Sequence, residues 1–411
     1  MMKKLLLLSA LALGLCGQAQ RTCGTPQKIQ ERLQTSPEFQ ANYEIVRQQL
    51  RNAATQQALS VESTAAQPSV VVTVQVVVHV LYKNATQNVS DAQIASQLTV
   101  LNNDFRKLNT DFATVVPTVF QPFGADLEIN FVMATTDPNG DPTTGITRKS
   151  VSNTFNFDNQ YYQAAGQPAW DTTSYLNIWV GNFTNPGLLG FAYPPGASGL
   201  DFDGLCIDYD NFGTIGTADA PFNKGRTGTH EIGHYFGLEH PWGDDMSNCG
   251  QSTNSDGAGD TPAVNGPTYG CPEFPDYSTA CSSTGNGSMF MNFMDYVDDG
   301  CMAFFTNGQK LITNAAVNGP RAGVLLGTSD LSSVASVKVY PNPVGSSFQV
   351  TSSLSELSKV ELFNIGGQLV KSQNLSGLEA SVDMSGFESG LYFARFYSGT
   401  KLLKSEKIVK Q

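Results

Sequence analysis

The sequence predicts a domain of mixed α-helices and β-strands followed by a small all-β sandwich. Between about residues 70 and 322, β-branched runs alternate with helical patterns and lead into a segment rich in Gly, Asp, Asn and Cys. From residue 337 onward, short strand patterns are separated by Gly-containing turns, and neither histidine nor cysteine occurs. A chain of 411 residues also exceeds one ordinary core, so at least two folded units are expected.

The charge balance excludes two classes of partner. Acidic residues outnumber basic residues by 36 to 24, and no basic run occurs after the first few residues. Nucleic acids and anionic membrane surfaces attract clustered lysine and arginine, so neither is an expected partner.

The first residues have the features of a secretory signal peptide. A basic start at Lys3-Lys4, an apolar run from Leu5 to Leu15 and small residues before Gln20 predict a signal peptide over residues 1–19. A lipid anchor on Cys16 is the alternative, although Leu15 is bulky where such signals carry a small residue. No later apolar run is long enough to span a bilayer. We therefore expect a chain exported through the periplasm without a transmembrane segment.

Residues 20–69 are expected to be a propeptide. They are polar and rich in Gln, and a loose Ala/Thr/Ser/Gln stretch follows their single helical pattern. The apolar positions of that pattern are Ile29, Leu33, Phe39, Tyr43, Val46 and Leu50.

The next domain begins with a strand and a helix. The β-branched run Val70–Tyr82 predicts a buried strand, and Ser90 followed by Asp91 predicts a helix start. His79, within that strand and far from any ligand spacing, is expected to be a packed core residue. Further strands are expected at Leu127–Ala134, Tyr175–Gly181 and Leu205–Tyr209. A closing helix is expected at Gln309–Ala316, followed by a linker over residues 323–336.

The segment Thr229–His240 holds three of the four histidines in the chain. On a helix, His230 and His234 project from one face about a turn apart, so both imidazoles can reach one ion. Gly237 can adopt a positive φ, end the helix and return the chain so that His240 becomes a third ligand. The spacing therefore predicts a zinc site with three histidine ligands.

Glu231 lies beside His230 without being a ligand. Zinc held by three histidines keeps a fourth position for water, and a neighbouring carboxylate can take a proton from that water during attack on a carbonyl. The pattern therefore predicts metal-assisted hydrolysis. The alternative, a core helix with incidental histidines, does not explain the third histidine.

Six cysteines remain after signal removal: Cys23, Cys206, Cys249, Cys271, Cys281 and Cys301. The last four fall in a segment with few periodic apolar residues, which needs covalent or metal cross-links to hold a shape. Four cysteines allow three pairings.

The extended pattern HExxHxxGxxH is typical of metzincin metalloproteases. The region from about Val70 to Arg321 resembles the pappalysin family of metzincins. The matching stretches are Ser90–Ile94, Val100–Phe105, Asp137-Pro138, Thr144–Ile146, the histidine motif, Asp260–Pro262 and Asn292–Tyr296 running into Cys301. The resemblance implies an α+β metzincin catalytic domain over residues 70–322, with a twisted mixed sheet and an irregular C-terminal subdomain stabilised by disulfides and calcium.

The resemblance also implies roles for residues outside the histidine motif. Met294 would be the Met-turn methionine that forms a hydrophobic floor under the metal, and Tyr296 would steady the oxyanion. The implied disulfides are Cys249–Cys281 and Cys271–Cys301. The implied calcium ligands are Asp256, Asp260 and the carbonyl of Thr261, although a solvated acidic loop is the alternative.

Two further features concern specificity and latency. In basic-specific relatives the chain after the Met-turn walls the pocket, so Asp298 and Asp299 favour Arg or Lys after the scissile bond, although Gly300 stands where those relatives carry an acidic residue. Cys23, followed by Gly24, resembles a cysteine-switch peptide, whose thiolate would occupy the position that water needs. The alternative is a disulfide between Cys23 and Cys206.

Residues 337–411 resemble the C-terminal sorting domain of type IX secretion, through Val339–Pro343, Gly390–Tyr392 and the strand at Lys404–Lys410. That resemblance implies export by the type IX machinery, and a binding module of the mature protein is the alternative. The sequence as a whole predicts a secreted zinc endopeptidase that acts on proteins or peptides and is made as a latent proenzyme. A surface adhesin with a structural metal site, or an amidase or esterase on the same fold, are the rival interpretations.

Overall fold

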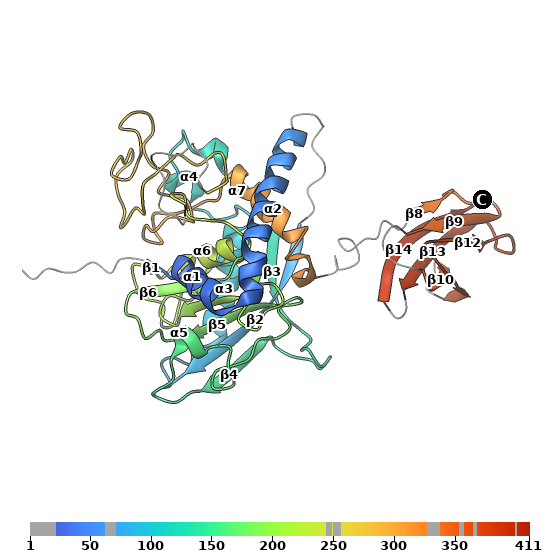
Figure 1. Cartoon of the computed structure of the whole chain (residues 1–411), viewed down its shortest axis with the longest axis horizontal. Helices are drawn as coiled ribbons and strands as arrows, with labels where there is room; N and C mark the ends of the chain where they lie inside the picture. Colours follow the sequence, from blue (N-terminus) through green and yellow to red (C-terminus); the bar gives the residue numbers. More distant parts are fainter. Residues whose placement is uncertain are drawn as a thin grey trace, which may run out of the picture.

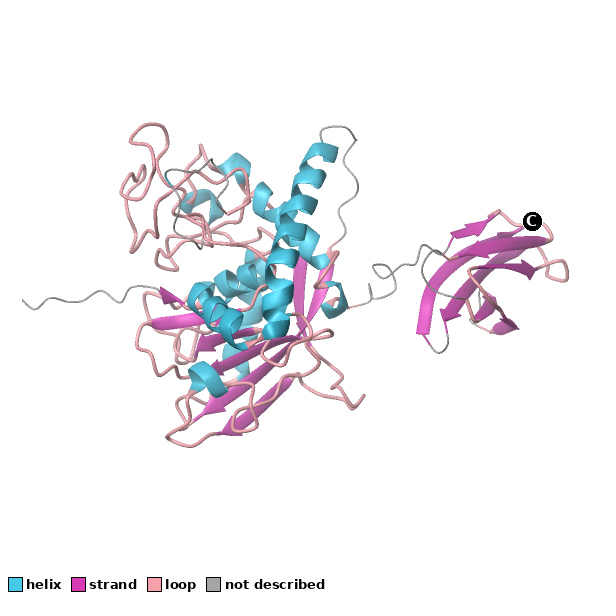
Figure 2. Ribbon diagram, in the orientation of Figure 1, coloured by secondary structure: helices cyan, strands magenta, loops and turns pink. Residues whose placement is uncertain are grey.

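A computed structural model describes residues 22–61, 71–243, 249, 256–326, 338–352, 357–364, 368–398 and 401–411. The expected signal peptide, the end of the expected propeptide and most of the expected linker lie outside the described residues. The α+β domain (residues 71–326) and the all-β part that follows it are seen in Figure 1 and Figure 2. The expected fold class is confirmed.

A seven-stranded mixed sheet forms the centre of the α+β domain, in the order β1-β6-β7-β5-β2-β3 with β4 also paired to β2. The long strand β2 pairs in parallel with β3, β4 and β5, because its β-branched side chains suit a strand buried on both faces. β6 runs antiparallel to β7. The strands are β1 (Thr22–Cys23), β2 (Val72–Tyr82), β3 (Ile129–Met133), β4 (Ile146–Ser150), β5 (Leu176–Gly181), β6 (Leu188–Ala192) and β7 (Leu205–Asp208).

Capping residues define the main helices of this domain. Ser90 accepts a hydrogen bond from the Gln93 amide at the start of α3 (Asp91–Asp104), as its position predicts. Thr306 and Gln309 form a reciprocal capping box at the start of α7 (Asn307–Val317). The helix of the histidine motif is α6 (Arg226–Tyr235), and two short helices are α4 (Phe112–Val115) and α5 (Phe157–Gln160).

The N-terminal segment (Thr22–Val61) differs from the expected single helix with a loose tail. It contains β1 and two helices, α1 (Thr25–Thr35) and α2 (Pro37–Val61). The break falls at Ser36, which is extended because a residue before proline disfavours the helical region. The Ala/Gln-rich stretch continues α2 because both residue types are good helix formers.

The N-terminal segment shares a core with the sheet. Ile29 of α1 and Phe39 of α2 are buried in the same apolar cluster as Trp179, Phe191 and Phe202. A second cluster contains apolar residues of β2, α3, α6 and α7. The segment is therefore packed into the α+β domain and does not form a separate unit.

The all-β part has a four-stranded sheet, β11-β10-β13-β14, and a three-stranded sheet, β12-β9-β8, around one apolar cluster. This is the expected small sandwich. Its strands are β8 (Lys338–Tyr340), β9 (Ser347–Thr351), β10 (Lys359–Asn364), β11 (Leu369–Asn374), β12 (Glu379–Asp383), β13 (Gly390–Ser398) and β14 (Lys401–Lys410).

Candidate metal centre

Helix α6 and the turn after it bring three imidazoles together. His230 and His234 project from α6, and Gly237, with φ +89°, turns the chain so that His240 returns to them. Only glycine takes that φ without strain, and an added Cβ would also lie 2.7 Å from a methyl carbon of Leu50. The sequence motif therefore folds as its spacing predicts.

The hydrogen bonds of these imidazoles turn three Nε2 atoms toward one another. The Nδ1 atoms of His230 and His234 lie 2.8 and 2.7 Å from the carbonyls of Phe293 and Leu238, so Nδ1 carries the proton in both rings. The Nε2 atom of His240 lies 3.1 Å from that of His234 and 3.3 Å from that of His230. The unprotonated Nε2 atoms of His230 and His234 thus converge with that of His240, and three imidazole nitrogens this close together fit the ligands of one metal ion.

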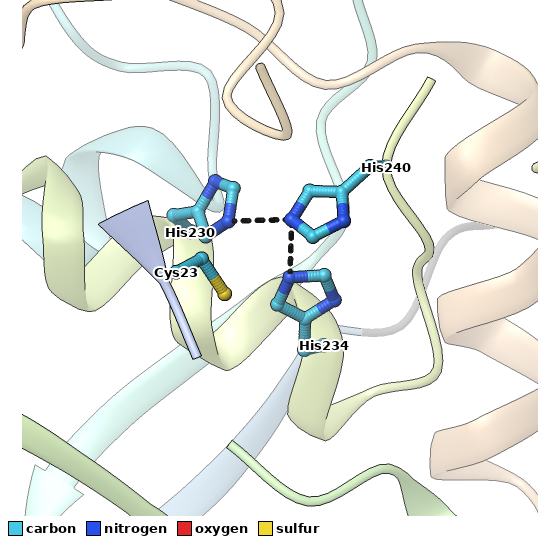
Figure 3. A group of neighbouring side chains, drawn as sticks. All are labelled: Cys23, His230, His234 and His240. Carbon is cyan, nitrogen blue, oxygen red and sulfur yellow. Dashed lines mark hydrogen bonds between the residues drawn. The ribbon is translucent and has the colours of Figure 1, made fainter. Parts of the chain in front are cut away.

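Cys23 of the N-terminal segment is the fourth member of this group. Its sulfur is turned toward the imidazoles (Figure 3), and the four ligand atoms lie within 4.8 Å of one another. Strand β1 pairs in parallel with β6, and the Gly24 amide donates to the Gly190 carbonyl at 2.8 Å. Cys23 and Cys206 are both buried and unpaired, so the alternative disulfide between them is absent.

The N-terminal segment also contacts Glu231. Its Oε2 accepts hydrogen bonds from Thr25 Oγ1 at 3.2 Å and from Cys23 Sγ at 3.5 Å. Burial, followed by the charge of Glu231, raises the pKa of the Cys23 thiol. A Cys23 thiolate therefore requires a cation beside it.

Three side chains support the imidazoles. Met294 is fully buried, and a Cβ added to Gly233 of α6 would lie 2.4 Å from its sulfur, so Met294 packs directly against the helix. The Tyr296 hydroxyl donates to the Cys23 carbonyl at 3.4 Å, and its ring meets His240 edge-on. The Trp242 indole stacks on His240, with ring centroids 4.6 Å apart and an interplanar angle of 3°.

Sequence reasoning missed Trp242 and Thr25. Trp242 lies two residues after His240, and Thr25 lies two residues after Cys23. An aromatic or polar residue this close to a predicted ligand is the sequence feature that could have indicated a supporting role. Sequence reasoning placed His79 correctly in the core, where it bonds to Thr147 and Asn177.

Two disulfides, Cys249–Cys281 and Cys271–Cys301, join the irregular segment that follows α6. Within it, Asp256 accepts hydrogen bonds from the Ala258 amide and the Thr261 hydroxyl. The two oxygens of Asp260 accept from the Thr306 hydroxyl and the Gly308 amide at the start of α7. Each predicted calcium-ligand carboxylate is thus fixed by hydrogen bonds: Asp256 within its own loop, and Asp260 to the start of α7.

The two acidic residues after the Met-turn have different environments. Asp299 is fully buried, and its Oδ2 accepts hydrogen bonds from the amides of Lys224 and Arg226. Asp298 remains partly exposed. Asp299 therefore holds the start of α6, and the expected preference for a basic residue stays a prediction.

Comparisons with known proteins agree with this geometry. The family model described as Pregnancy-associated plasma protein-A matches residues 159–318, and the one described as Secretion system C-terminal sorting domain matches residues 338–411. An extracellular metalloprotease of Colletotrichum graminicola is 30% identical over 318 residues, which is 75% of this chain and 94% of that relative.

Two solved structures are also similar. Mature mirolysin of Tannerella forsythia, solved with a cleaved peptide, is 42% identical with a TM-score of 0.59, over 64% of this chain and 99% of that one. A mutant of promirolysin from the same organism is 38% identical with a TM-score of 0.62, over 76% of this chain and 99% of that one. Among the described residues, no helix is both long and apolar enough to cross a membrane.

Proposed function

The chain belongs to the pappalysin family of metzincin metalloproteases and is secreted, and from this premise we propose that it is a zinc endopeptidase made as a latent proenzyme. The convergence of the Nε2 atoms of His230, His234 and His240 is the observation that carries this proposal. An adhesin with a structural metal would need a fourth permanent protein ligand. Here the fourth group, Cys23, comes from the segment that we expect to be removed.

The residues of the chain have distinct roles in this hydrolysis. His230, His234 and His240 would hold a zinc ion, which would supply the positive charge needed to polarise a peptide carbonyl and to acidify water. The Oε2 atom of Glu231 takes a proton from the attacking water and then passes it to the leaving amine. Tyr296, once its hydroxyl is freed from the Cys23 carbonyl, donates toward the oxyanion.

The edge of the sheet supports an extended substrate. Strand β6 pairs with β7 on one side and with β1 on the other, so removal of the N-terminal segment leaves the β6 backbone groups available. A substrate peptide can add to that edge as a strand beside Glu231. Gly190 lets β6 lie directly against Glu231, because a Cβ added to Gly190 would lie 2.8 Å from the Glu231 side chain.

Latency is assigned to Cys23. With zinc bound by the three histidines, the Cys23 sulfur would take the position that water needs, and Thr25 donates to the general base Glu231 at the same time. Cys23→Ala should therefore speed autoactivation, whereas Cys206→Ala should not, because the two thiols are unpaired. A Cys23→Ala proenzyme that matures no faster than wild type would refute this assignment.

A preference for Arg or Lys after the scissile bond is assigned to Asp298. Asp299 accepts hydrogen bonds from the Lys224 and Arg226 amides at the start of α6 and is fully buried, whereas Asp298 is partly exposed. Peptide-library profiling should show a basic preference that weakens in Asp298→Asn. Large apolar residues at that position would overturn the assignment.

Casein digestion with and without a chelator tests the proposed function. The processed enzyme should lose activity when its metal is removed and recover it when zinc is restored. Activity that is unchanged by complete metal removal, or protein that holds zinc but cuts no peptide bond, would overturn it.

A further inference from the structure

The N-terminal segment makes a second set of contacts with the α+β domain, through residues more than twenty positions after Cys23. Arg47 and Arg51 lie four residues apart on α2 and both bind the Glu239 carboxylate. Arg47 donates through Nε at 2.7 Å and through a terminal nitrogen at 3.1 Å. Arg51 donates to both carboxylate oxygens at 2.9 Å. Two guanidinium groups on one carboxylate form a specific, charge-assisted contact.

Glu239 is poorly placed to be left without these partners. It is 9% exposed and directly precedes His240. After burial, the negative charge of Glu239 also contributes to the raised pKa of the Asp256 carboxyl. Docking of α2 covers this carboxylate and at the same time supplies two cations that compensate its loss of solvent.

A third arginine of the N-terminal segment enters an aromatic pocket. The guanidinium carbon of Arg32 lies 4.2 Å from the ring centroid of Phe202 and 5.1 Å from that of Tyr162. Arg32 Nε also donates to the Tyr193 hydroxyl at 3.1 Å. Phe39 packs edge-on against Tyr193 and Phe202, so an aromatic side chain closes the same pocket.

A pair of exposed amide residues lies about 100° around α2 from the arginine pair, because each follows an arginine by one position. Gln48 and Asn52 are exposed, are also four residues apart, and bond to each other at 2.9 Å. The arginine pair therefore belongs to the docking face of α2, and the amide pair provides a control of matched spacing on the same helix.

We propose that Glu239 and the Tyr162/Tyr193/Phe202 pocket form a guanidinium-binding surface of the α+β domain, separate from the metal ligands, whose occupant is α1–α2 of this chain. This surface holds the N-terminal segment in place without help from the covalent link to β2. Cutting the chain after α2 therefore does not by itself end latency, because the segment must also dissociate. The consequence for activity rests on the proposed protease function, whereas the binding does not.

A cleavable full-length chain tests the binding. A recognition site for an unrelated protease is inserted between α2 and β2 in a Glu231→Gln background, so that the protein cannot process itself. After the cut, retention of the N-terminal fragment is followed by size-exclusion chromatography at low and high salt. The wild-type fragment should stay bound, and Arg47→Ala/Arg51→Ala should dissociate at least about tenfold faster, because loss of a desolvated charge pair acts mainly on dissociation.

The controls separate charge from helix stability. Gln48→Ala/Asn52→Ala should behave as wild type, and Arg47→Lys/Arg51→Lys should give an intermediate rate, because lysine keeps the charge but not the paired geometry. Arg32→Gln should also speed dissociation. Immediate loss of the wild-type fragment, or equal retention in all variants, would overturn the proposal.

The catalytically competent chain gives an independent measurement. Arg47→Ala/Arg51→Ala should mature faster than wild type, and the mature enzymes should have equal kcat/KM because their sequences are identical. If mature wild-type enzyme has no proteolytic activity, the proposed function fails, but the fragment-retention result still decides the present proposal.

Discussion

The indole of Trp242 supports a single metal ligand. His230 and His234 have their Nδ1 atoms fixed by backbone carbonyls, whereas His240 lies flat against Trp242 and edge-on to Tyr296. Aromatic packing against Trp242 and Tyr296 therefore contributes to the position of the third imidazole. Groups that orient a ligand contribute to metal affinity as well as to geometry.

Trp242→Ala should weaken zinc binding about 10- to 100-fold, the usual effect of losing a group that orients a ligand. Trp242→Phe should retain most of the affinity, because an aromatic ring can still stack on His240. Competition with a chromogenic chelator measures both. Equal zinc affinity in wild type and Trp242→Ala would show that the stack has no such role.

At the scale of elements, the irregular segment after α6 depends on cross-links and buried acids. Two disulfides cross-link this segment. In addition, Asp260 accepts hydrogen bonds at the start of α7, where the helix dipole favours a carboxylate. Burial raises the pKa of Asp256 to about 7. We assign Asp256, Asp260 and the Thr261 carbonyl to calcium as a proposal, and this pKa makes the proposal testable.

Calcium should stabilise the enzyme more at pH 8 than at pH 6. The folded pKa of Asp256, about 7, lies above its ordinary value of 3.8, so without calcium its contribution to stability falls as pH rises between these values. Calcium requires the ionised carboxylate, so protons compete with it below pH 7. Thermal unfolding with and without calcium measures the effect, and Asp256→Asn should remove its pH dependence. An equal calcium effect at both pH values would contradict the assignment.

The sequence predicted elements where local signals were strong. The β-branched run gave β2, the Ser90 cap gave α3, and the histidine spacing gave the metal group. It did not predict β6, whose short Gly-containing run resembles a turn. It also missed the break at Ser36 and the continuation of α2 beyond Leu50, and it gave no sign that the arginines of α2 face a carboxylate almost 200 positions later in the chain. Such contacts are set by tertiary packing, which single-sequence periodicity does not report.

At the scale of the whole molecule, the all-β part has its own core and a family match as a sorting domain. Its chemistry is unrelated to the metal group, because residues 338–411 contain neither histidine nor cysteine. The part is therefore expected to direct export without contributing to hydrolysis.

Deletion of residues 338–411 should stop export by the type IX machinery, while protein purified from the periplasm should process itself and digest casein with unchanged kcat/KM. Fusion of the same residues to an inert carrier should direct that carrier outside the cell. Export of the truncated chain at the wild-type level, or loss of its activity after correct folding, would be inconsistent with this separation of roles.

The most direct test of the account is the Glu231→Ala enzyme, purified with its zinc content measured alongside its activity. We propose that Glu231 moves protons and does not bind the metal, so zinc should remain near one ion per chain while proteolysis falls by about 10² to 10⁴ or more, the usual effect of removing a general base. Full proteolytic activity in zinc-loaded Glu231→Ala protein would contradict the account.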